Sequence, residues 1–219
     1  MTPADHLAVW LRVREQVAWH HIVVHMAGPV RALRDGFADY ARATADRGPD
    51  RLRRLLDAQA DVRQAAAAGI GLTAELLARW NRTTLGVPVA QFRRATAYAK
   101  NGRERYGLDA DTPRRFATCL AEANDTVTPL TARAARVYLD VAFFHPHNDG
   151  NARLAGLVLQ FVLLREHVEL DEVAPILGMV RRADDADGAE ALARLIHGMT
   201  AASHRRWLRR PPNARPPSG

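Results

Sequence analysis

The sequence predicts an all-α protein, a helical bundle that carries one small β-hairpin, and three observations support this. Apolar residues recur with the 3.6-residue period of a helix over most of the 219 residues. Glycines interrupt that period where helix ends are expected. One stretch, near residues 92–107, instead alternates with the two-residue period of a strand and contains Asn-Gly.

Four helices are expected in the first part of the chain. Spaced Leu, Val, Trp and Ala side chains supply their apolar faces, and glycines at 28, 48, 69 and 86 lie near the breaks. The expected ranges are Pro3–Met26, Pro29–Asp46, Pro49–Ala68 and Thr73–Leu85.

Five helices are expected in the second part of the chain. The first opens with a threonine cap and a first-turn proline, which is typical of a helix start. The third is apolar nearly all round, which indicates a helix at the centre of the bundle. The expected ranges are Thr112–Ala123, Thr131–Phe144, Gly150–Arg165, Asp171–Arg182 and Ala189–Trp207.

The hairpin is the one departure from helical patterning. In the run QFRRATAYAK the larger side chains alternate with smaller ones, and Asn101-Gly102 follows, which favours a two-residue type I′ turn. The alternative is a solvated loop. Because a lone two-stranded ribbon is marginally stable in water, it must pack on the bundle or bind a partner.

Composition bounds the class of protein. With 47% hydrophobic and 25% charged residues the chain can fold around one core. A single cysteine, Cys119, excludes an intrachain disulfide and a cysteine-based metal site, and it suits a reducing cytoplasm. The first residues lack a signal-peptide pattern, and the longest apolar run, Leu154–Leu164, is too short to cross a membrane.

Charge gives little support to a nucleic-acid partner. The net charge of +7 comes almost entirely from arginine, with Lys100 as the only lysine, and acidic residues are interspersed throughout. We therefore expect neither nucleic acid nor membrane as a partner.

The segment FFHPHNDGNARLAGLVLQF carries the chemistry. It places a polar turn between two core helices, and the free N–H groups and dipole at the start of the second helix favour an anion such as phosphate. His145 is a base near neutral pH, Asp149 is a hard oxygen ligand suited to Mg²⁺, and Arg153 can clamp phosphate oxygens. Taken singly, these residues could equally be a helix-end histidine, an N-cap and a surface charge.

Taken together, they resemble the signature of Fic-domain proteins, H-P-F-x-(D/E)-G-N-G-R. The matching positions are His145, Pro146, Asp149, Gly150, Asn151 and Arg153. The order of elements is also similar, from Leu72-Thr73 opening a helix, through Phe92-Arg93 before the hairpin, to two helices leading into the motif. The resemblance covers about Thr73 to Arg182.

The resemblance implies an all-α Fic fold with a β-hairpin flap and a nucleotidyltransferase that moves AMP from ATP to a Ser, Thr or Tyr hydroxyl of a target protein. It implies that His145 deprotonates the hydroxyl and that Asp149 holds Mg²⁺. It further implies that Gly150, Asn151 and Ala152 line an anion hole and that Arg153 holds the distal phosphates.

The resemblance also implies partners and an organisation of the chain. The flap, roughly Arg93–Tyr106, would align an extended segment of the target by adding a strand. Residues 1–68 form an N-terminal helical segment packed on the core, residues 69–207 form the Fic-like domain, and residues 208–219, rich in proline, form a flexible tail.

Two positions depart from the family pattern. Ala152 replaces a glycine, which keeps the N–H group and costs little if the backbone there is helical. His147 replaces a phenylalanine, either as a hydrogen-bonded aromatic filler beneath the turn or as a polar group suited to a different acceptor. Of these two readings we favour the filler.

Regulation and reaction type stay open in the sequence. No glutamate is followed by Gly or Asn, so the family's self-inhibitory pattern is absent, and a separate antitoxin-like inhibitor protein is one explanation. The alternatives to AMP transfer are a phosphotransferase like the Doc toxins, transfer to a small-molecule acceptor, or a non-catalytic binding module. His21 and His25 share a helix face and are a weak metal pair without a third ligand.

Overall fold

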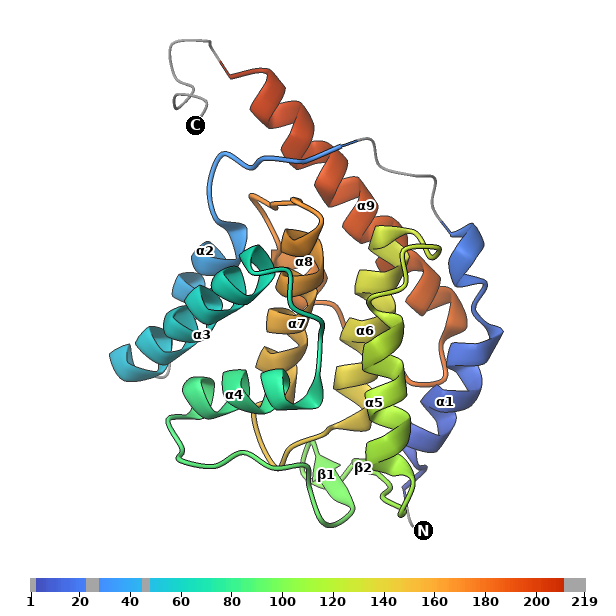
Figure 1. Cartoon of the computed structure of the whole chain (residues 1–219). Coiled ribbons are helices and arrows are strands. Elements are labelled where there is room, and N and C mark those ends of the chain that lie inside the picture. Colours follow the sequence, from blue (N-terminus) through green and yellow to red (C-terminus); the bar gives the residue numbers. More distant parts are fainter. Residues whose placement is uncertain (1–2, 23–27, 45–47, 211–219) are drawn as a thin grey trace.

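The apolar helix predicted at the centre of the bundle does lie there. In the computed structural model, which describes residues 3–22, 28–44 and 48–210, α7 (Asn151–Arg165) is buried over most of its circumference. It packs along α6 (Leu130–Phe144), the other buried helix. Residues 145–150, which carry most of the Fic-like motif, join these two helices (Figure 1). The packing of α6 against α7 therefore fixes the position of the motif.

Two groups of helices cover this central pair (Figure 1). On the α7 side lie α2 (Gly36–Ala43), α3 (Pro49–Ala67) and α4 (Ala74–Leu85). On the α6 side lie α1 (His6–Gln16), α5 (Thr112–Glu122) and α9 (Ala186–Leu208). None of the described helices is long and apolar enough to span a membrane.

Most of the predicted helices are confirmed within one or two residues. These are α3, α4, α5, α6 and α7. For example, the Thr73 hydroxyl accepts a hydrogen bond from the Leu76 N–H at 3.2 Å and starts α4. The predicted threonine cap of α5 is wrong, because Asp111 occupies the N-cap position and Thr112 is the first helical residue. The last long helix, α9, begins three residues earlier than predicted because Asp185 caps it.

The prediction of one helix over residues 3–26 is wrong. Helix α1 ends at Gln16, Val17 is extended, and a short 3₁₀ turn (η1, Trp19–His21) follows. The break lets buried Trp19 turn back, so that its indole N–H donates to the Arg14 carbonyl at 2.9 Å. His21 therefore belongs to the 3₁₀ turn, while His25 lies outside the described residues, so the metal pair remains untested there.

Two other predicted helices are too long. Residues before α2 are not helical because Val30 pairs with Val168 in an isolated bridge, through Val30 N–H to the His167 carbonyl at 2.9 Å. In the range 171–182 only α8 (Ala174–Leu177) is helical. Asp171 instead accepts hydrogen bonds from Ser203 and Arg206 of α9, which holds the chain before α8 in a tertiary contact. The predicted flexible tail lies outside the described residues from 211 on.

The predicted hairpin is confirmed, with a different turn. Strands β1 (Ala97–Ala99) and β2 (Glu104–Tyr106) pair antiparallel, with Tyr98 opposite Arg105. The turn comprises four residues, 100–103, because the last pair is Ala99 with Glu104. Positive φ angles occur at Lys100, Asn101 and Gly102, so the Asn-Gly signal located the turn but not its length.

The hairpin packs on the bundle through Asp5, the residue that caps α1. The Asp5 carboxylate accepts a hydrogen bond from the Gly107 N–H at 2.9 Å and forms an ion pair with Arg105 at 3.2 Å. A side chain at position 107 would collide with that carboxylate. The ribbon is thus tied at its base, which meets the requirement that it not stand alone.

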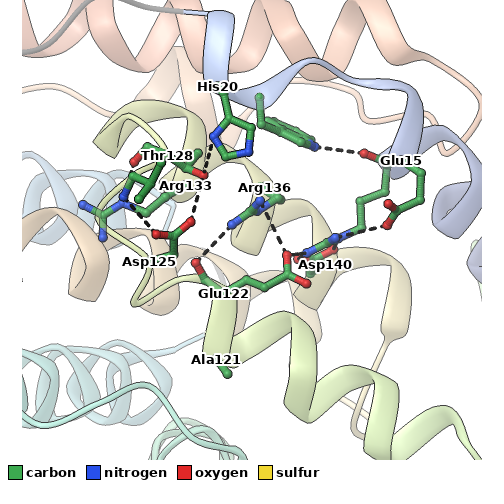
Figure 2. A network of polar contacts seen from close by, with 12 residues as sticks. Glu15, His20, Ala121, Glu122, Asp125, Thr128, Arg133, Arg136 and Asp140 are labelled. Atoms are coloured by element: carbon green, nitrogen blue, oxygen red, sulfur yellow. Dashed lines mark hydrogen bonds and ion pairs between the residues drawn. The ribbon is translucent and has the colours of Figure 1, made fainter.

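Buried charges fasten α1 and α5 to α6. Arg14 donates to Asp140 at 2.8 and 3.1 Å and to Glu122 at 2.7 Å, and Arg136 of α6 lies 3.5 Å from the same Glu122. Figure 2 shows Arg136 and Glu122 pointing toward each other, with Asp140 beside them. Asp140 is fully buried and also accepts the Trp10 indole N–H at 2.9 Å. Burial raises the pKa of Asp140, and the contacts with Arg14 and Trp10 oppose that rise.

Candidate functional site

The segment between α6 and α7, residues 145–150, forms a sharp turn that we call the motif turn. Helix α6 ends at Phe144 and is capped by His145, whose backbone is left-handed with φ 50° and ψ 56°. Helix α7 begins after Gly150, which has φ 83°. The first N–H groups of α7 have no partner within the helix, as at any helix start, and they face the polar residues of the turn.

Asn151 closes the motif turn from within. Its side-chain amide donates to the His147 carbonyl at 2.7 Å, and its side-chain oxygen accepts the His147 N–H at 3.0 Å. Because Asn151 is buried and both of its polar atoms are occupied, its side chain holds the loop. Its backbone N–H, in the first turn of α7, is available as a donor to an anion.

Asn81 of α4 holds the turn from the other side, and the sequence reasoning did not identify it. Its amide donates to the Asp149 carbonyl at 3.1 Å. A Cβ atom at position 150 would lie 2.8 Å from the Asn81 side-chain oxygen, and the positive φ there also disfavours a side chain. Glycine is therefore required at 150. No local pattern around Asn81 distinguishes it from other polar helix residues.

Arg93 joins the motif turn to the base of the hairpin. Although it carries a charge, its side chain is only 3% exposed. Its guanidinium donates to the carbonyls of four residues at the end of α6 and around the hairpin: Phe144, His145, Ala95 and Gly107. Its backbone N–H donates to the Pro146 carbonyl at 2.8 Å. The alternating pattern of the hairpin run gave no sign of this role.

His145 is held as a neutral base. Its Nδ1–H points to the Ala142 carbonyl at 3.4 Å, which leaves Nε2 with a lone pair. Its ring stacks on Tyr106 of β2, with centroids 4.3 Å apart and planes at 15°. Burial lowers the pKa of His145 below its ordinary value, with the nearby Arg93 charge acting in the same direction. The hairpin thus positions the imidazole directly.

His147 is buried beneath the turn, with 5% of its surface exposed. Its Nδ1–H donates to the Gln91 carbonyl at 2.9 Å. Burial lowers the pKa of His147 and keeps it neutral at pH 7. These contacts favour the interpretation of His147 as a hydrogen-bonded filler over a role in contacting an acceptor.

Asp149 and Arg153 lie next to each other at the start of α7. The Asp149 carboxylate is 77% exposed, accepts the Gly150 N–H at 2.6 Å and lies 3.8 Å from the Arg153 guanidinium. The Gly150 N–H, predicted to line an anion hole, is thus engaged by Asp149. Ala152 is helical, so the condition that makes alanine acceptable there is met.

The donor set suits a metal that arrives with a phosphorylated substrate. No group of three or more His, Cys, Asp or Glu side chains in the described part of the chain could hold a metal alone. Mg²⁺ commonly uses one or two carboxylates together with substrate phosphate oxygens, and an exposed Asp149 beside a helix N-terminus fits that use.

The comparisons with known proteins identify the fold. No protein-family model and no curated protein sequence matches the chain. A Fic-domain-containing signaling protein from Bacteroides thetaiotaomicron is 18% identical, with a TM-score of 0.52 over 79% of this chain and 77% of that one. Fic-1 from C. elegans is 15% identical, with a TM-score of 0.55 over 93% and 71%.

IbpAFic2 is 15% identical, with a TM-score of 0.56 over 92% of this chain and 71% of that one. A variant of IbpAFic2 has been solved in complex with adenylylated Cdc42, at 14% identity and a TM-score of 0.55. At these identities the likeness establishes the architecture, a helical bundle with a two-stranded ribbon, and leaves the reaction to be argued from the site.

Proposed function

We propose that this chain, which has the fold of Fic-domain proteins, is a cytoplasmic nucleotidyltransferase that moves AMP from ATP to a Ser, Thr or Tyr hydroxyl of a target protein. The observation that carries the proposal is the motif turn. It brings a neutral imidazole, an exposed carboxylate and an arginine together at the N-terminus of the central helix.

His145 acts as the general base. Its Nε2 takes the proton of the acceptor hydroxyl, and the hydroxyl oxygen attacks the α-phosphorus of ATP. A bond forms between that oxygen and the α-phosphorus, the bond from the α-phosphorus to the bridging oxygen breaks, and pyrophosphate leaves. The neutral state imposed by burial keeps Nε2 free to accept the proton at pH 7.

The start of α7 binds the nucleotide. The backbone N–H groups of Asn151 and Ala152, with Gly150 making room for close approach, face the phosphates, and Arg153 pairs with the distal ones. Asp149 would hold Mg²⁺, which when bound neutralises phosphate charge. The protein's part is therefore mainly positioning and charge compensation.

The hairpin supplies the docking edge for the target. Strand β1 pairs with β2 on one side, and Tyr98 on it is 58% exposed, so an extended segment can add beside it. IbpAFic2, with which this chain shares the fold, is seen with an adenylylated protein, which supports a protein acceptor. A separate inhibitor protein would restrain the enzyme.

The test uses purified protein, a bacterial lysate as the source of acceptors, and ATP labelled at either the α- or the γ-phosphate. Label from α-labelled ATP should reach a protein band, and His145→Ala should abolish it while calorimetry shows little change in ATP affinity. Transfer of the γ label would instead establish a Doc-like phosphotransferase. Undiminished α transfer by the His145 variant would refute the assignment of the base.

A further inference from the structure

A cavity of about 400 Å³ opens beside the first two turns of α7. Its walls come from α2, α3, the start of α7, the end of α8 and the segment between α8 and α9. Its charged lining residues are Arg51, Arg153 and Arg181, and no acidic side chain of the described residues lines it. We call it the arginine cavity.

Arg181 is an arginine without a carboxylate partner among the described residues. Its guanidinium donates to the Tyr138 hydroxyl and lies 4.9 Å from the centre of the Tyr138 ring. Tyr138 is fully buried, so this contact holds the guanidinium in place. Burial lowers the pKa of Arg181, yet an arginine stays protonated at pH 7. The cavity therefore contains a fixed cation that forms no ion pair with a described carboxylate, although the Glu104 charge on β2 acts on it from a distance.

Arg51 adds a second cation from the first turn of α3. Its guanidinium makes no ion pair with a carboxylate of the described residues, whereas Arg53 on the same helix lies 3.7 Å from Asp50 and 3.5 Å from Asp57. The two residues are two positions apart on α3 and so lie on different faces of the helix. Arg51, which makes no ion pair, lines the cavity, whereas Arg53, which pairs with Asp50 and Asp57, does not line it.

We propose that the arginine cavity binds the two terminal phosphates of a nucleoside triphosphate, with Arg51 and Arg181 as phosphate ligands in addition to Arg153. This rests on the proposed function, in which those phosphates leave as pyrophosphate. A pyrophosphate group carries several negative charges on a small volume, which matches a cavity lined by three arginines next to a helix N-terminus.

The rest of the lining strengthens that attraction. Phe37, Leu52 and Leu55 supply apolar surface, which lowers the local dielectric and makes charge pairing stronger than in water. The arginine cavity would then select nucleotides by the length of their phosphate chain, favouring triphosphates over monophosphates, and would stabilise pyrophosphate as it departs.

Calorimetry with inorganic pyrophosphate, ATP and AMP tests this without requiring turnover. Arg51→Gln and Arg181→Met should each weaken the binding of pyrophosphate and of ATP at least tenfold, with AMP affinity changed less than threefold. The matched controls, Arg53→Gln on α3 and Arg182→Met beside Arg181, are 65% and 68% exposed and pair with carboxylates outside the arginine cavity. They should leave all three affinities unchanged.

Because Arg181 contacts a buried tyrosine, its variant is compared by thermal melting, and Arg51→Gln decides the matter if Arg181→Met unfolds. Pyrophosphate affinity that is the same in wild type and in folded Arg51→Gln would overturn the proposal, as would an equal loss of AMP and ATP affinity. Loss of pyrophosphate binding in these variants, together with absence of AMP transfer by wild type, would uphold the phosphate site and refute the reaction.

Discussion

Replacing Arg93 by methionine should destabilise the protein and disable transfer together. Met approximates the length of the side chain and removes the hydrogen bonds that the guanidinium donates to Phe144, His145, Ala95 and Gly107. A hydrogen bond from a charged donor contributes roughly 1.5–3 kcal/mol. The simple sum over these bonds would therefore equal much of the ~5–15 kcal/mol that is the whole free energy of unfolding of a typical domain.

Two effects reduce that sum. The bonds share one guanidinium and are not independent, and Met avoids the cost of burying a charge, a cost visible in the lowered pKa of Arg93. We therefore expect a loss of about 3–5 kcal/mol, comparable to removing one partner of a buried ionic contact. At about 2–4 °C per kcal/mol, the melting temperature should fall by roughly 6–20 °C.

The assays are urea unfolding and transfer from α-labelled ATP, and the neighbouring Arg94 provides the control. Arg94 is exposed and makes one side-chain hydrogen bond, to Gln91 at 3.0 Å, so Arg94→Met should change the free energy of unfolding by less than about 0.5 kcal/mol. Arg93→Met should also lose transfer at a temperature where it is folded, because the carbonyl of His145 is released. Equal stability of the two variants would show that the Arg93 contacts do not support the turn.

Five further predictions concern the site. Asp149→Ala should make residual transfer insensitive to added Mg²⁺ in a metal titration, and Arg153→Ala should weaken ATP binding by about 1.5–3 kcal/mol in calorimetry. Tyr106→Leu should lower kcat by about 10- to 100-fold with little change in ATP affinity, because it removes the ring that stacks on His145. Tyr106→Phe keeps that ring and should retain most of the wild-type kcat. Because burial lowers the pKa of His145 and of His147, the folded chain binds fewer protons than the unfolded chain near pH 6. In urea titrations the free energy of unfolding should therefore fall as the pH drops below about 6.5. Transfer should be at its plateau at neutral pH, where His145 is neutral. His147→Phe should lower the free energy of unfolding by only about 0.5–1.5 kcal/mol, because phenylalanine cannot make the hydrogen bond to Gln91, and it should leave transfer intact. A folded variant that binds nucleotide but turns over little would show that His147 takes part in the chemistry.

The helices predicted correctly from the sequence are those with start signals in their own segment or with apolar residues on most sides. Helix α4 carries its own side-chain cap, α3 and α5 begin with a first-turn proline, and α6 and α7 are buried on most sides, so the periodicity of these helices is clear. Residues 29–35 and 171–173 carry helix-like spacing but pair elsewhere, Val30 with Val168 and Asp171 with α9. Such tertiary pairings override propensity and leave no local trace.

The site divides in the same way. Residues whose chemistry is concentrated in one segment, His145 to Arg153, are visible in the sequence because their order matches a known pattern. Asn81, Arg93 and Arg181 reach the site from α4, the start of the hairpin and the loop before α9. Each is an ordinary polar residue in its own segment, and only the packing of distant elements gives it a role.

The buried charges of α6 explain why His145, at the end of that helix, is held in one position. Burial of apolar surface is non-directional, so a helix in place of α6 with apolar residues alone could take several rotations of similar apolar burial, and His145 would move with it. Asp140, five residues before His145, accepts hydrogen bonds from both Trp10 and Arg14, and Arg133 donates to the Ala123 and Thr128 carbonyls. Any rotation of α6 would leave these charges buried and unpaired, at several kcal/mol each, so the polar contacts far from the motif turn fix where the base lies.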